Sequence, residues 1–397
     1  MKYIILAFTA LGLSLSSMSV FSVDLKVSGY GSITMGKTIG GEKDAGGEVE
    51  YIADFYDVGL YDEGVDFRPE SIFAVQGEMI LSSDLSVVAQ LVGKGTDDFS
   101  PEFDWYYAKY KLTNESSIMA GRRNIPMYYF SEFMEVGFAY PWVRPPSNLY
   151  WWQITQFNGV TYSYNFLLGD GDYANTISVF GGGEDSENNK EMTYYNSLGF
   201  YGNPDGRVGD ADHTDESWEN IIGLNWKVSH DYFDVRLSAF THDFVRDIHY
   251  VNNTPANAAH YDASMPEIGK THYETKQTFI GLGGAIYLSP FTLYFDYNHV
   301  SRDDTAKTVY PTYFLSLVYE IGKWQPFIGY SKADHTTQAT DDLEEHRLIS
   351  AGVRYNVLEN AAIKIQYDNF VDQGDQATGW DYHNDAEHLA ISLDFVF

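Results

Sequence analysis

Apolar and polar residues alternate one by one along much of this chain. The alternation is clearest in residues 387–397, where one face holds Leu389, Ile391, Leu393, Phe395 and Phe397 and the other holds His388, Ala390, Ser392 and Asp394. A period of two residues is typical of a β-strand with one apolar face. The same pattern recurs in residues 361–370, 291–300 and 232–242, so we expect strands from one end of the chain to the other.

Sixteen segments show this alternation. They lie near 24–36, 71–82, 85–95, 103–113, 116–123, 158–168, 173–181, 219–228, 232–242, 278–288, 291–300, 310–320, 324–331, 347–357, 361–370 and 387–397. The predicted fold is therefore all-β.

The connections between these segments alternate strictly between short and long. The short ones are residues 83–84, 114–115, 169–172, 229–231, 289–290, 321–323 and 358–360. An even number of antiparallel strands, joined by short turns at one end and long loops at the other, is typical of a closed transmembrane β-barrel. A soluble β-solenoid or a string of sandwiches remains an alternative, but neither predicts this alternation of connection lengths.

The composition agrees with a barrel and excludes several other classes of protein. The chain has 32 Tyr, 25 Phe, 8 Trp and 35 Gly, which suits strands with one lipid-facing side. It has no cysteine, so disulfides and thiolate metal sites are excluded. A net charge of −31 argues against nucleic acid as a partner. The acidic run 341–345 lacks the spaced ligands of a calcium loop, and we predict neither a metal site nor a cofactor.

The first residues have the features of an export signal. Lys2 precedes a mostly apolar stretch from Tyr3 to Leu15. Val20 and Ser22 satisfy the preference for small residues before a cleavage site, so we predict a signal peptide over residues 1–22 and a barrel over residues 23–397. An uncleaved anchor is the alternative, but a stretch of 13 residues is shorter than the roughly 20 that a helical span needs.

The chain resembles the Gram-negative porin superfamily at three places: the opening Val27-Ser28-Gly29-Tyr30-Gly31, the alternating last strand ending in Phe397, and a long third loop over residues 124–157. The resemblance implies a 16-stranded barrel, a homotrimer, and a third loop that folds inward to constrict the channel. It also implies partners: the lipid bilayer with its lipopolysaccharide, and the barrel-assembly machinery, which would recognise the strand ending in Phe397. The acidic proline-glycine signature of the best-known general porins is missing from the third loop.

The third loop is rich in aromatic residues and proline. We infer that it packs against the inner barrel wall; contact with a neighbouring subunit or with lipid headgroups is the alternative. If a specific substrate is transported, its stacking track would be the aromatic residues Tyr128, Tyr129, Trp142, Trp151 and Trp152.

Charged residues of both signs could create a field across the constriction. The loop offers carboxylates and one arginine. The wall offers cations at those alternate strand positions that share a face with the polar residues. The candidates are Glu132, Glu135 and Arg144 from the loop, and Lys109, Lys111, Arg122, Arg123, Arg236 and Arg354 from the wall. Since a porin lumen is polar, any of them could simply pair with a neighbouring charge.

Residues 37–70 hold ten acidic and three basic side chains, which would make the outer vestibule negative. We therefore expect a passive channel for small hydrophilic solutes with a mild preference for cations. The alternatives are a substrate-specific channel, an adhesin or phage receptor, and an outer-membrane enzyme. For the last, Thr241-His242-Asp243 is the nearest approach to a catalytic set, and no nucleophile motif or zinc-protease motif occurs.

Overall fold

A computed structural model of the protein describes residues 24–43, 47–150, 152–197, 211–250, 270–337, 344–374 and 383–397. The expected signal peptide and its cleavage site lie outside these residues, as does Trp151. Among the described residues, no helix is both long and apolar enough to cross a membrane.

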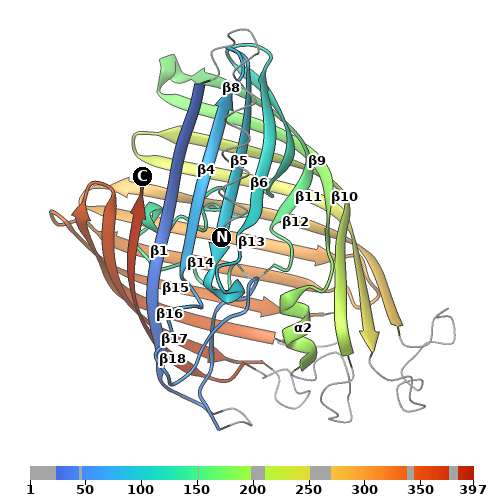
Figure 1. Cartoon of the computed structure of the whole chain (residues 1–397), viewed down its shortest axis with the longest axis vertical. Helices are drawn as coiled ribbons and strands as arrows, with labels where there is room; N and C mark the ends of the chain where they lie inside the picture. Colours follow the sequence, from blue (N-terminus) through green and yellow to red (C-terminus); the bar gives the residue numbers. More distant parts are fainter. Residues whose placement is uncertain are drawn as a thin grey trace, which may run out of the picture.

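Sixteen antiparallel strands form a closed barrel (Figure 1). They are β1 (Asp24–Gly41), β4 (Ile72–Ile80), β5 (Leu85–Lys94), β6 (Glu102–Lys111), β7 (Ser116–Asn124), β8 (Gln156–Leu168), β9 (Tyr173–Ser186), β10 (Ala211–His230), β11 (Phe233–Tyr250), β12 (Lys270–Leu288), β13 (Phe291–Arg302), β14 (Val309–Tyr319), β15 (Trp324–His335), β16 (Glu344–Leu358), β17 (Ala361–Asp372) and β18 (Ala386–Val396). Each pairs with its neighbours in sequence, and β1 closes the barrel by pairing with both β4 and β18. The sixteen predicted strands and the fold class are confirmed.

The alternation of residue types explains how each strand lies in the wall. On β18, Leu389, Ile391 and Leu393 are exposed on the outside, while Ser392 and Asp394 are buried on the inside. An apolar outer face of this kind is suited to lipid, and closure of the barrel leaves no strand edge with unpaired backbone groups.

Several strands are longer than their alternation predicts, and the excess is largest in three neighbouring strands. β10, β11 and β12 have 20, 18 and 19 residues, whereas about 9–11 residues suffice to cross a bilayer. At the long-loop end of β10 the outward positions are His213, Asp215 and Glu219 instead of apolar residues. The apolar signal on the outer face therefore ends before the strand does, and the hydrogen-bonded ladder continues beyond it.

The connections contain small elements that the alternation does not predict. The first loop, residues 42–71, holds a hairpin of β2 (Tyr51–Asp54) and β3 (Gly59–Tyr61). The helix α2 (Lys190–Ser197) follows β9. Short 3-10 turns lie at Gly95–Asp97, Gly137–Ala139 and Gly169–Gly171.

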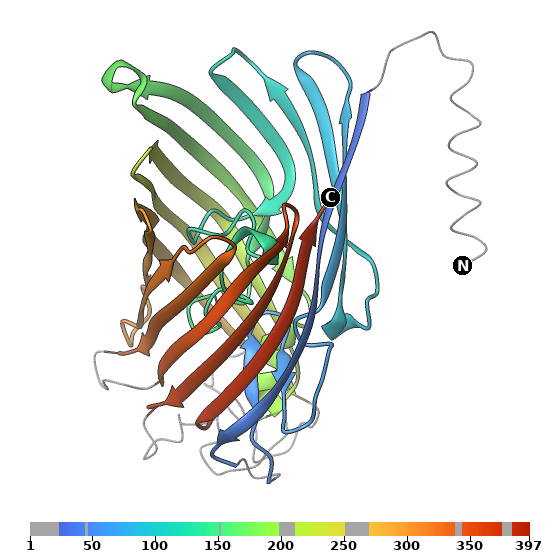
Figure 2. The same cartoon turned by 90° about the vertical axis from the view of Figure 1, so that its left-hand side faces the viewer.

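The third loop, residues 125–155 in the structure, lies inside the barrel, where Figure 2 shows it in teal among the strands. Part of the interior is apolar. Phe240, Phe244 and Phe279 of the wall form one buried cluster with Tyr128 and Trp152 of the loop. On this side the barrel is filled by a hydrophobic core instead of the polar surface expected of a porin lumen.

Candidate functional site

Cations of the barrel wall hold the third loop by its main chain. Arg236 of β11 donates to the carbonyl of Tyr128 at 2.8 Å, and Arg354 of β16 donates to those of Phe138 and Tyr140 at 2.6 and 3.0 Å. Lys364 of β17 donates to the carbonyls of Gly137, at 2.5 Å, and Trp142. All three cations are buried. Because their donors are directed at the main chain of the loop, these three side chains support the loop. For Arg236 and Arg354 this differs from the sequence analysis, which predicted that they line the constriction.

Acceptors of the wall bind the loop's N–H groups in the same way. Tyr129 N–H donates to Asp296 Oδ2 at 2.9 Å, and Val143 N–H donates to Gln366 Oε1 at 2.8 Å. A buried main-chain group without a partner is costly, so the polar face of the wall is what allows the loop to lie inside the barrel.

Two glycines permit the close approach of loop and wall. A Cβ at Gly137 in the loop would overlap Asp394 and Ser32, and one at Gly283 of β12 would lie 2.8 Å from Tyr129 Cβ. Both positions therefore need the absence of a side chain.

The aromatic residues of the third loop form packing contacts. Trp142 is 1% exposed, donates from Nε1 to Ser316 Oγ at 3.3 Å, and meets Tyr294 and Phe314 edge to face. Tyr128 and Trp152 are also buried, against Phe279 and Tyr310. Tyr129 is only partly buried. The structure thus places Tyr128, Trp142 and Trp152 in the core, where their rings have little surface left for a solute.

Charged residues connect the third loop to the first loop. Lys94 of β5, 6% exposed, pairs with Asp57 of the first loop at 2.7 Å and with Glu135 of the third at 2.6 Å. Arg144 of the third loop pairs with Asp54 of the first at 2.8 Å. Four of these residues, Asp54, Asp57, Glu135 and Arg144, line a cavity of about 40 Å³ between the two loops.

Burial acts on the two first-loop acids with different results. It raises the pKa of Asp54 in spite of the charge of Arg144. It also opposes the ionisation of Asp57, but the charge and hydrogen bond of Lys94 outweigh it and lower the pKa of that carboxyl.

A second cavity, of about 100 Å³, lies between the third loop and β7–β10. Arg123, Glu132 and Lys227 line it together with the hydroxyls of Thr161 and Ser163. Glu132 and Lys227 form an ion pair. Burial opposes ionisation of Glu132, but Lys227, Arg236 and Arg123 outweigh it and lower the pKa of Glu132 to about 2. This cavity can present a fixed carboxylate and two cations to a small polar solute.

The other four predicted wall cations do not gather at one site. Adjacent strand residues point to opposite faces, and Arg122 pairs with Glu184 of β9 while Arg123 lies over the ring of Tyr107 at 5.4 Å. Lys109 and Lys111 lie at the short-turn end of β6, where the main-chain N–H of Lys111 donates to the main-chain carbonyl of Asp84 in the preceding turn. Only Arg123 of these four lines either cavity.

Sequence reasoning did not select Lys94 or Lys227 for the site. Lys94 shares its parity with the buried Val88, Gln90 and Val92, a signal that could have placed it inside the barrel. The role of Asp54 and Asp57 had no such signal, because it depends on how the first loop folds back.

A closed sixteen-stranded barrel with a loop held inside it is the architecture of the outer-membrane porins. No protein-family model and no curated protein sequence matches the chain. Solved structures do. The chain is similar over 96% of its length to all of the outer membrane channel DcaP of Acinetobacter baumannii, with a TM-score of 0.58 and 9% identity.

Two further structures support the same fold. Outer-membrane expressed OmpT of Vibrio cholerae aligns over 96% of this chain and 99% of its own, with a TM-score of 0.57 and 10% identity. An anion-selective porin from Comamonas acidovorans aligns over 95% and 100%, with a TM-score of 0.54 and 14% identity. The chain has the fold of the 16-stranded porins.

Proposed function

We propose that the protein is an outer-membrane channel for the passive diffusion of ions and small hydrophilic solutes. One observation carries this proposal: a third loop is held inside a closed barrel by hydrogen bonds from the wall, and charged residues line the spaces beside it. A loop of this kind narrows a wide barrel to a passage of molecular size.

The charge balance supports a mild preference for cations. Beside the first cavity, Asp54, Asp57 and Glu135 stand against Lys94 and Arg144, so the ion pairs leave a small negative excess. The acidic first loop adds a negative field at the mouth. The anion-selective porin from Comamonas acidovorans has a similar fold, so selectivity has to be argued from these residues and not from the fold.

The same proposal includes the surroundings of the channel. It places the protein in the outer membrane after cleavage of residues 1–22, in contact with lipopolysaccharide, and delivered through the barrel-assembly machinery. It also includes a homotrimer, which the in-vitro folded trimer form of OmpT from Vibrio cholerae supports through its similar fold, at a TM-score of 0.54.

Conductance of the purified protein in a planar bilayer tests the proposal. In a potassium chloride gradient we expect stable steps, in groups of three for a trimer, with a reversal potential that favours potassium. Steps blocked by one class of sugar or organic acid would instead indicate a substrate-specific channel. A correctly folded barrel that gives no conductance would exclude the proposed function.

A further inference from the structure

Four titratable side chains meet at the long-loop end of the barrel, apart from both cavities. Glu344 and His346 lie two residues apart on β16 and so share a face of the strand. His335 of β15 pairs in register with Glu344, and His383 comes from the segment just before β18. The sheet itself therefore brings three of the four together, and the fourth arrives from the last loop.

The ligand atoms of three of these side chains, Glu344, His346 and His383, are spaced as those around one ion would be. Glu344 Oε1 lies 3.4 Å from His346 Nε2 and 3.6 Å from His383 Nε2, and Glu344 Oε2 lies 3.8 Å from His335 Nδ1. Ligand atoms about 2.0–2.1 Å from a tetrahedral ion lie roughly 3.3–3.4 Å from one another. The ligand atoms of Glu344, His346 and His383 all lie within 4.8 Å of each other.

Burial makes the charge of this cluster significant. His346 is fully buried, and Glu344 and His335 are 5% and 6% exposed. The ion pairs of Glu344 in the described part of the chain are with the three histidines alone. Neutral imidazoles do not compensate a buried carboxylate, so the cluster needs either a bound proton or a bound cation.

Packing fixes the orientation of the rings. Tyr310 stacks on His335 with centroids 4.2 Å apart, and Phe370 lies 5.1 Å from His346. Phe55 of the first loop meets the ring of His383 edge to face at 5.2 Å. The main-chain N–H of His383 donates to Asp372 Oδ2 at 2.9 Å and so fixes the backbone that carries this ring. Ligands held in place by such neighbours bind a metal without a large loss of side-chain entropy.

We propose that Glu344, His346 and His383 bind one divalent transition-metal ion of the zinc type, with His335 beside them, next to the other oxygen of Glu344. Two imidazoles and one carboxylate suit Zn²⁺ better than Ca²⁺ or Mg²⁺, which prefer sets of oxygen ligands. The ion supplies the positive charge that Glu344 lacks. It also ties β16 and the last loop together beneath Phe55 of the first loop.

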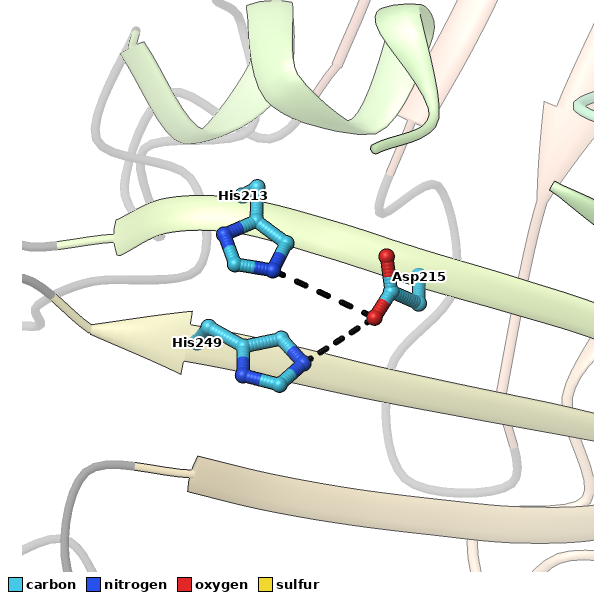
Figure 3. Close-up of side chains that lie close together, drawn as sticks. All are labelled: His213, Asp215 and His249. Carbon is cyan, nitrogen blue, oxygen red and sulfur yellow. Dashed lines mark hydrogen bonds and ion pairs between the residues drawn. The ribbon is translucent and has the colours of Figure 1, made fainter. Parts of the chain in front are cut away.

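A second group of residues whose spacing could suit a metal lies at the rim of the barrel, and it is more exposed than this cluster. His213 and His249 stack at 4.2 Å, and His249 lies 3.1 Å from Asp215 Oδ2, an ordinary hydrogen-bonding distance (Figure 3). All three are half-exposed. Because this group could bind added metal weakly, it has to be removed in the experiment.

Zinc titration of the full-length mature protein tests the proposal. Protein carrying His213→Ala and His249→Ala is purified in detergent, treated with a chelator and titrated with ZnCl₂ by calorimetry. We expect one site per chain, with affinity that weakens on acidification because the ligands bind in their deprotonated forms. Co²⁺ is expected to give the intense visible absorption of a tetrahedral site.

His346→Ala is expected to lower the zinc affinity at least about 100-fold, since loss of an outer partner alone costs about 10- to 100-fold. The matched control is His388→Ala, which removes a buried histidine of β18 whose Nδ1 lies 3.5 Å from Asp368 Oδ2 of β17. The zinc affinity of this variant should be unchanged. Near-ultraviolet circular dichroism verifies that each variant is folded. Absence of a saturable site, or equal loss of binding in both variants, would overturn the proposal.

Discussion

At the scale of single residues, the charged groups inside this barrel are divided between two tasks. Arg236, Arg354 and Lys364 donate to main-chain carbonyls of the third loop, whereas Arg123, Glu132 and Lys227 line a cavity. Both sets lie at the same strand parity or on the same loop, so their type and position in sequence do not separate them. What separates them is the direction of each side chain relative to the loop.

Glu132 gives a prediction at this scale. Its pKa is lowered to about 2, so its ionisation stabilises the fold above the ordinary carboxyl range, and this contribution is lost as the pH falls from about 4.5 to about 2. Glu132→Gln should therefore lower the melting temperature at pH 7, and the difference from the parent protein should vanish near pH 2. Thermal unfolding followed by tryptophan fluorescence at several pH values measures this.

The control for Glu132→Gln is Glu115→Gln, which changes an exposed carboxylate of a short turn. In a channel, Glu132→Gln should also shift the reversal potential toward anions, because Lys227 and Arg123 lose their counter-charge. A difference in melting temperature that persists at pH 2 would show that Glu132 acts through packing and not through its charge.

At the scale of elements, the third loop and the wall form one packed unit. Trp142 is enclosed by aromatic residues from β13, β14 and β15, and the loop's main chain bonds to β11, β13, β16 and β17. A loop held at so many points is expected to be rigid. The position of the loop, and with it the size of the proposed passage, depends on the polar residues of the wall.

Lys364 is the most deeply buried support and gives the prediction at this scale. It pairs with Asp394 at 2.9 Å, and both side chains are 0% exposed. Lys364→Met should destabilise the protein by about 3–5 kcal/mol, since it leaves a buried carboxylate uncompensated. It should also increase current noise, because two carbonyls of the loop lose their donor. Denaturant unfolding and single-channel recording measure the two effects.

Adding Asp394→Leu to Lys364→Met should restore part of the stability, because no unpaired charge then remains. Lys109→Met on β6 serves as the control for loss of a wall cation that does not touch the third loop. If the double variant were as unstable as the single one, the destabilisation would have to come from the lost loop contacts instead of the buried charge.

At the scale of the whole molecule, the chain has a net charge of −31, whereas the charges beside the third loop, where we propose the passage, are mostly paired. The long-range field of the exposed acids and the short-range field of the buried pairs should respond differently to salt. Exposed charges are screened over about 30 Å at 0.01 M and about 3 Å at 1 M, and buried pairs are screened far less.

The ratio of potassium to chloride permeability should therefore be largest in dilute potassium chloride and approach one near 1 M. Reversal potentials in gradients of fixed ratio, measured at increasing mean concentration, give the permeability ratio at each salt level. A ratio that does not change with salt would assign selectivity to the buried residues Asp54, Asp57 and Glu135 in place of the outer acids.

The barrel was predictable from sequence because its determinants are local. Each strand needs only an alternation that matches its two surroundings, and the lengths of the connections then give the antiparallel order. Where this signal stops, the prediction also stops. The outward positions of β10 become polar toward the long-loop end, and the ladder extends further than the pattern.

The site was only partly predictable because it depends on the return of long loops into the barrel. Sequence alone determined the sixteen strands, which residues face inward, and that the third loop has aromatic residues to bury. Only the tertiary structure decided that Lys94 joins Asp57 to Glu135, that Arg354 and Lys364 hold a loop, and that three histidines surround Glu344. The physical reason is that side-chain parity is fixed by the period of a strand, whereas contacts between residues far apart in sequence are fixed by packing.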